Sequence, residues 1–134
     1  MSNDATSGDA APAVAGTPLR LLRLEGAALL AAAVATYWQI GASRWMFILL
    51  ILAPDLSFLA YPAGPRVGAA VYNAAHTTLG PLALALFGVL APSPMAIAVA
   101  LIWAAHIGAD RMLGYGLKYG TGFAFTHLGR IGRV

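Results

Sequence analysis

The sequence predicts an all-α fold: a four-helix transmembrane bundle with a disordered N-terminal tail and a glycine-rich C-terminal surface segment. Of the 134 residues, 60% are hydrophobic and only 10% are charged, whereas soluble domains carry about 25% charged residues. The mean hydropathy is +0.75. No charged residue occurs between positions 67 and 109, which is room for two crossings of about 20 residues each. This length suits one membrane domain, residues 18–134.

The first two elements follow from composition and from proline. Residues 1–17 are small or polar and cannot bury enough apolar surface to fold, so we expect a disordered tail. Pro18 suits the first turn of a helix over residues 18–40. A second helix is predicted over 45–61, bent at Pro54 so that Asp55 lies at the kink.

The long uncharged stretch divides into two further helices. Pro92 and Pro94 separate a helix over residues 67–90 from one over residues 94–114, and Pro81 predicts a kink in the former. The glycines that follow disfavour another helix, so the C-terminal segment is expected on the membrane surface. These glycines are Gly114, Gly116, Gly120 and Gly122.

The distribution of cations predicts the orientation. Four crossings place both termini on one side, and that side carries all the cations of the chain except Arg44. By the positive-inside rule this predicts a multi-pass protein of the cell inner membrane with both termini cytoplasmic. The cations lie at helix ends and not on one face, so we expect membrane lipid as partner, no nucleic acid, and a homo-oligomer as one option.

Six polar residues are embedded in the predicted helices. A helix rises about 1.5 Å per residue, and counting from the helix ends brings all six into the cytoplasmic half of the bilayer. They are Glu25, Asp55, Asn73, His76, His106 and Asp110. A carboxylate at the centre of a spanning helix costs about 2.5 to 3.5 kcal/mol, so the three acids require a bound cation, a basic partner or protonation.

Each of these residues also has a structural interpretation. Glu25 could pair with a nearby arginine, and Asp55 could cap a broken helix. Asn73 and His76 could make interhelical hydrogen bonds, whereas His106 and Asp110, four residues apart, could orient one another. His127 could be a surface residue.

Several motifs resemble the bacterial domain-of-unknown-function family 4260 over residues 19–132. The resemblance implies a small four-helix membrane protein whose activity is unassigned. The motifs include Pro54-Asp55-Leu56-Ser57, Tyr72-Asn73-Ala74-Ala75-His76, His106-Ile107-Gly108-Ala109-Asp110-Arg111 and Gly114-Tyr115-Gly116-Leu117-Lys118-Tyr119.

The first functional hypothesis is a metal-dependent hydrolase or another lipid-modifying enzyme. Without cysteine, a metal needs nitrogen and oxygen ligands, which suit zinc, manganese or iron. Three roles are assigned: ligands for a divalent metal, catalytic acids, and substrate binding. The ligands are His76, His106, Asp110 and Asp55; the catalytic acids are Glu25, as general base, with Asp55 and Asp110; the substrate-binding residues are Asn73, Arg66, Arg111 and His127.

Two other classes remain open. A metal-free cyclase or isomerase of an isoprenoid lipid could use protonated Asp55 or Glu25 as the acid. A proton-coupled or ion transporter, or a structural membrane subunit, would use the same intramembrane acids and histidines as a relay. Four short helices leave little room for alternating access, so a transporter would have to be an oligomer.

Overall fold

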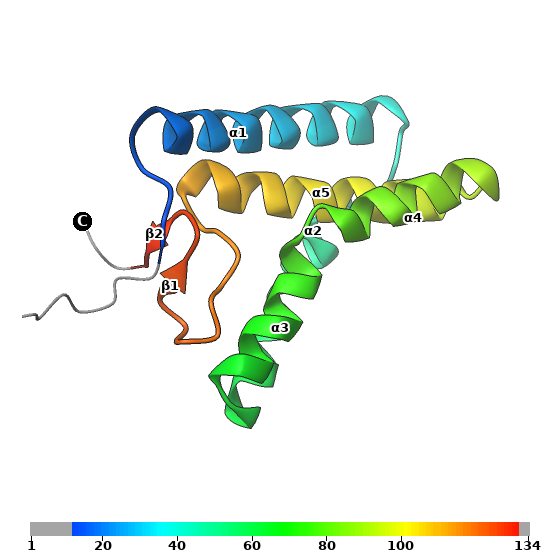
Figure 1. Cartoon of the computed structure of the whole chain (residues 1–134). Helices are drawn as coiled ribbons and strands as arrows, with labels where there is room; N and C mark the ends of the chain where they lie inside the picture. Colours follow the sequence, from blue (N-terminus) through cyan, green and yellow to red (C-terminus); the bar gives the residue numbers. More distant parts are fainter. Residues whose placement is uncertain (1–11, 132–134) are drawn as a thin grey trace, which may run out of the picture.

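The computed structural model describes residues 12–131 and confirms the all-α class. The elements are α1 (Gly16–Gln39), α2 (Arg44–Leu50), the 3-10 helix η1 (Ala53–Ala63), α3 (Pro65–His76), α4 (Leu79–Leu90), α5 (Pro94–Leu113), and the short strands β1 (Phe125–Thr126) and β2 (Gly129–Arg130) (Figure 1). The predicted disordered tail, residues 1–17, lies mostly outside the described residues. Its last two residues belong to α1.

Three helical stretches are long and apolar enough to cross a membrane: 44–63, 65–90 and 94–113. They match the second, third and fourth predicted crossings, and the chain is therefore a membrane protein. Among the described residues, α1 does not reach the same apolar character. Its first half carries Arg20, Arg23 and Glu25, and the weakly apolar residue alanine fills its middle.

Two prolines divide the second and third predicted helices. Proline has no N–H to donate to the carbonyl four residues earlier. Accordingly, α2 ends at Leu50, four residues before Pro54. Likewise, α3 ends before Thr77, which is extended (ψ 144°) and lies four residues before Pro81. The bend predicted at Pro81 therefore begins one turn earlier and turns α4 away from α3 (Figure 1).

α1 and α5 run antiparallel side by side, and glycines let them approach closely (Figure 1). A Cβ atom on Gly108 would lie 2.6 Å from the Leu30 nitrogen and 2.8 Å from the Gly26 oxygen. Small residues allow such close contact between membrane helices. Gly108 is rotated about 200° from His106 around α5, so the glycine faces α1 while the histidine faces the opposite side.

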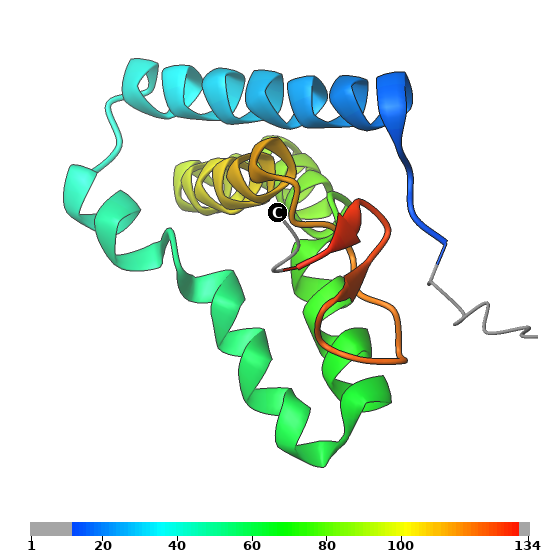
Figure 2. The same cartoon turned by 90° about the vertical axis from the view of Figure 1, so that its left-hand side faces the viewer.

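η1 and α3 form an antiparallel helical hairpin around Gly64, whose φ of 117° favours glycine (Figure 2). Three residue pairs cross the hairpin: Tyr61 with Gly68, Phe58 with Tyr72, and Asp55 with His76. Successive partners are three residues apart on η1 and four apart on α3. With rises of about 2.0 and 1.5 Å per residue, both helices advance about 6 Å from one pair to the next. The two helices therefore stay in register up to Asp55.

The C-terminal segment was predicted to lie on the membrane surface without a further helix, and it contains a small antiparallel sheet. Strand β1 pairs with β2, and an isolated bridge links Lys118 to Thr126. Lys118, Thr126 and Leu128 are buried. The segment is therefore packed against the helices, and the interpretation as a surface segment misses this packing.

Candidate metal centre

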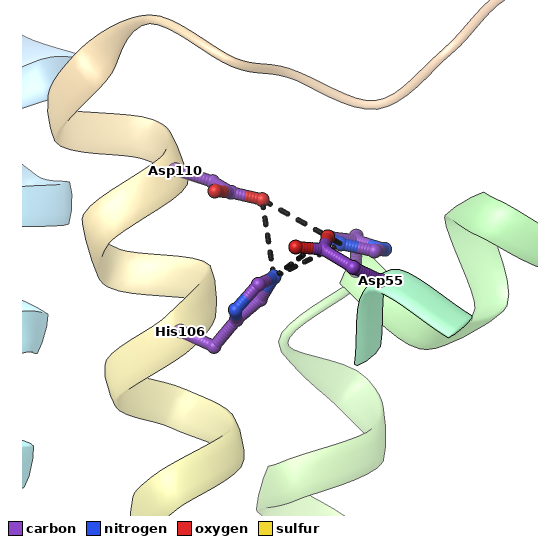
Figure 3. Close-up of side chains that lie close together, drawn as sticks. Asp55, His106 and Asp110 are labelled. Carbon is purple, nitrogen blue, oxygen red and sulfur yellow. Dashed lines mark hydrogen bonds and ion pairs between the residues drawn. The ribbon is translucent and has the colours of Figure 1, made fainter. Parts of the chain in front are cut away.

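Two histidines and two aspartates meet where α5, α3 and η1 converge (Figure 3). His106 and Asp110 lie on one face of α5 because they are four residues apart. His76 is the last residue of α3, and Asp55 lies in the first turn of η1. These four residues are the metal ligands that the sequence predicts, and they come from three different elements.

Each histidine lies close to both carboxylates. The Nε2 atom of His76 is 3.3 Å from Asp55 Oδ1 and 3.5 Å from Asp110 Oδ2. The Nε2 atom of His106 is 3.3 and 3.4 Å from the same two oxygens. The two Nε2 atoms are 3.2 Å apart.

Five of the six distances among these four atoms match the edges of a metal-coordination tetrahedron. Zinc lies about 2.0 to 2.2 Å from nitrogen and oxygen ligands, so neighbouring ligands around a tetrahedral ion are about 3.4 Å apart. Five of the six edges here are between 3.2 and 3.5 Å. The sixth edge, between the carboxylate oxygens, is no longer than 4.8 Å. One cation at the centre can therefore reach all four ligands.

Hydrogen bonding prepares the His76 ring for a cation. Its Nδ1 atom lies 2.9 Å from the Tyr72 carbonyl oxygen, and a carbonyl only accepts, so Nδ1 carries the proton. In the neutral ring, the Nε2 lone pair then points into the cluster. The His76 ring also stacks on the Tyr72 ring, with centroids 3.8 Å apart. Such partners fix the orientation and tautomer of metal-binding histidines.

The cluster is closed on its histidine side and open on its carboxylate side. The side chains of His76 and His106 are 3% and 5% exposed, whereas those of Asp55 and Asp110 are 35% and 21% exposed. Both acids line a cavity of about 290 Å³. Its other lining residues are Phe58, Tyr72, Tyr115, Lys118, Phe123 and Ile131.

Asn73 holds the C-terminal segment against α3. Its side-chain nitrogen donates to the Lys118 carbonyl at 2.8 Å, and its side-chain oxygen accepts from the Lys118 N–H at 2.6 Å. The Asn73 amide is therefore engaged by main chain. This contact gives Asn73 a positioning role, and its contact with substrate stays a prediction.

Lys118 is the site residue that the sequence analysis missed. Its ammonium group donates to the Phe123 carbonyl at 2.8 Å and lies 3.5 Å from the centre of the Phe123 ring, with Tyr72 and Phe58 next to it. Burial lowers the pKa of Lys118 to about 8, against the opposing effect of the two aspartates. The available signal was that Lys118 is the only lysine in the chain.

Arg111 and His127 lie next to the cluster and contact each other. Arg111 Nη2 donates to the His76 carbonyl at 3.4 Å, and Nη1 lies 3.2 Å from His127 Nε2. The Leu117 N–H donates to His127 Nδ1 at 2.9 Å. Burial, and secondly the Arg111 charge, lower the pKa of His127. Arg111 and the Leu117 N–H are both donors, and a neutral imidazole has one acceptor nitrogen, so the neutral His127 ring accepts only one of these two hydrogen bonds.

Two predicted site residues do not join the cluster. Glu25 is exposed on α1 and is not among the four clustered residues. Arg66 is exposed in the first turn of α3, and His76 at the other end is about 15 Å further along the helix. The predicted general base, Glu25, and one predicted substrate-binding residue, Arg66, therefore lie away from the cluster.

Comparison with known proteins places the chain in a family. The model of the family described as "Domain of unknown function (DUF4260)" matches residues 19–131, and the chain belongs to this family. The resemblance inferred from the motifs is thus confirmed. No curated protein and no solved structure matches the chain.

Proposed function

We propose that this DUF4260 protein is a metal-dependent hydrolase that acts on membrane lipid. Asp55, His76, His106 and Asp110 would bind one divalent cation. The observation that carries the proposal is the tetrahedral spacing of their four ligand atoms, with five edges of 3.2 to 3.5 Å.

Charge balance supports a divalent cation. Both carboxylates belong to stretches that can span a membrane, where an uncompensated charge is costly. Two neutral histidines and two carboxylates together carry two negative charges, which one divalent ion neutralises. Mixed imidazole and carboxylate ligands suit zinc, manganese and iron.

The open carboxylate side supports a catalytic role. Structural zinc sites are closed by four protein ligands, whereas catalytic sites keep a position for water. With four protein ligands here, water would be a fifth ligand, on the side of the two partly exposed carboxylates. A divalent ion held by these residues would lower the pKa of a bound water to about 7, so that the water could attack at neutral pH. Each aspartate also has a second oxygen that could accept the proton of this water. In this proposal the second oxygen of Asp55 or Asp110 acts as the general base, in place of the exposed Glu25.

An apolar cavity next to the cluster supports a lipid substrate. This cavity of about 210 Å³ includes Pro54 and Ala75, which directly precede two of the ligands. Its remaining lining residues are Leu50, Ala53, Val99, Ile102 and Trp103. A lipid chain could occupy it while the polar end of the lipid reaches the carboxylate side.

Elemental analysis of protein purified in detergent without added metal tests the site. We expect about one divalent ion per chain, a strong loss in Asp110→Asn and His106→Ala, and no loss in Glu25→Gln, the matched acid outside the cluster. A folded wild-type protein without metal would refute the proposal. It would also favour the proton-relay or metal-free alternatives.

The activity is tested separately with a membrane-lipid extract. Metal-loaded protein should convert a lipid into hydrolysis products seen by mass spectrometry, and both chelation and Asp110→Asn should abolish the conversion. Turnover that survives chelation would favour a metal-free cyclase or isomerase.

A further inference from the structure

Lys118 is a buried cation without an acidic partner. The residue is 4% exposed, and within residues 12–131 no carboxylate lies within ion-pair distance of its ammonium group. A buried charge normally has a partner of opposite sign. Here the contacts are the Phe123 carbonyl and the faces of aromatic rings.

The ammonium group retains hydrogen-bonding capacity toward the cavity. A lysine ammonium has three N–H donors, and the Phe123 carbonyl accepts one of them. Lys118 lines the same 290 Å³ cavity as Asp55 and Asp110. This volume lies near the lower limit of small-molecule pockets, about 300 to 1,000 Å³, and suits a polar head rather than a whole lipid.

The charge of this cavity depends on the proposed metal. Without a metal, two carboxylates and one ammonium leave one net negative charge, which repels an anion. A divalent ion changes this to one net positive charge. The cavity therefore becomes attractive to an anion only when the metal centre is filled.

We infer that the cavity is a binding site for a phosphate group, held between Lys118 and the metal ion. The inference rests on the proposed function and names the charged part of its substrate. Phosphate has several acceptor oxygens, so one can approach the metal while another accepts from the ammonium group. Lysine binds phosphate as a point charge, and the aromatic rings around Lys118 fix its position.

The single lysine allows a direct test on the unaltered protein. Lysine labelled with ¹³C at Cε gives the NMR signal of Lys118 alone, because the chain has no other lysine. Adding inorganic phosphate to metal-loaded protein in detergent should shift this signal in a saturable manner. Chelation of the metal should remove the response. A signal that phosphate leaves unchanged in metal-loaded protein would overturn the inference.

A variant and a matched control measure the contribution of the charge. Lys118→Met should keep its metal and bind phosphate at least about tenfold more weakly, since it loses a hydrogen bond between two charged groups. Arg130→Gln is the control, because Arg130 is an exposed cation near the Phe125 ring and does not line the cavity. Its phosphate affinity should not change.

The outcomes separate this inference from the proposed function. Equal phosphate affinity in metal-loaded wild type and Lys118→Met overturns the inference and leaves the metal centre intact. A wild-type protein that binds no metal overturns the proposed function itself. Two ligands distinguish the source of the phosphate: tighter binding of a short-chain phosphatidic acid than of inorganic phosphate indicates a lipid headgroup, and the reverse order indicates free phosphate.

Discussion

Replacing Asn73 by alanine should detach Lys118 from α3 without removing a metal ligand. The variant loses two hydrogen bonds to the Lys118 main chain, each with a net value of about 0.5 to 1.5 kcal/mol. Lys118 is 4% exposed, so a main-chain group left without a partner there adds about 1 to 3 kcal/mol. We expect a total loss of about 2 to 6 kcal/mol in the free energy of unfolding.

Unfolding with increasing SDS in mixed micelles measures this free energy, and Thr78→Ala, an exposed site in the loop after α3, is the control. The Asn73→Ala variant should keep its metal, while the ¹³C signal of Lys118 should move and phosphate affinity should fall.

Two results would refute the reasoning. A loss below about 0.5 kcal/mol, the smallest value of one such bond, with an unchanged Lys118 signal would mean that other contacts hold the segment. An unchanged Lys118 signal with lost phosphate affinity would support the original prediction that Asn73 contacts the substrate.

Three further substitutions test other parts of the fold and the site. Gly108→Ala should cost about 1 to 3 kcal/mol of stability, as overpacking does, because its new methyl group meets the α1 main chain; an unchanged SDS midpoint would contradict this. The pKa of His127 is lowered in the folded protein, so folding favours the neutral ring. Its contribution to the free energy of unfolding is therefore fully present above about pH 6.5 and is lost as the pH falls. His127→Asn, which cannot be protonated, should therefore lose less stability than wild type between pH 7.5 and 5.5 in chelator, and equal losses would exclude this effect. Pro54→Ala should let α2 continue through Asp55 and lower the metal content, whereas Pro62→Ala should not; equal metal content in both would show that Pro54 is dispensable.

The convergence of four of the six embedded polar residues could be predicted from the sequence. Proline positions and the length of apolar stretches fix where each helix begins, and the rise per residue then fixes the depth. This reasoning placed Asp55, His76, His106 and Asp110 at one level, and the structure brings them together.

The same reasoning failed for Glu25 because depth does not specify direction. Glu25 and Gly26 lie at nearly the same depth, but they are rotated by about 100° around α1. Gly26 faces α5, where a Cβ atom would meet the Arg111 side chain, and Glu25 is exposed. Both faces of α1 are rich in alanine, so the hydrophobic pattern does not identify the packed face.

The contribution of the C-terminal segment could not be predicted for a different reason. Its position depends on long-range contacts, in which Asn73 binds the main chain of a residue 45 positions later. No periodic pattern in the glycine-rich sequence indicates this contact. The position of Lys118 beside the cluster follows from it.

The 3-10 geometry of η1 explains why Asp55 reaches the metal centre at all. In an α-helix, residues three apart are rotated by about 300°, which falls about 60° short of a full turn. Over the two three-residue steps from Tyr61 to Asp55, the side-chain direction would therefore change by about 120°. In a 3-10 helix, three residues complete one turn and stay aligned. Tyr61 can then pack on Gly68 while Asp55 meets His76 two steps further along. Such helices rarely exceed 3 or 4 residues, yet η1 has 11. Its length is therefore best explained by the need to deliver one carboxylate in register with α3.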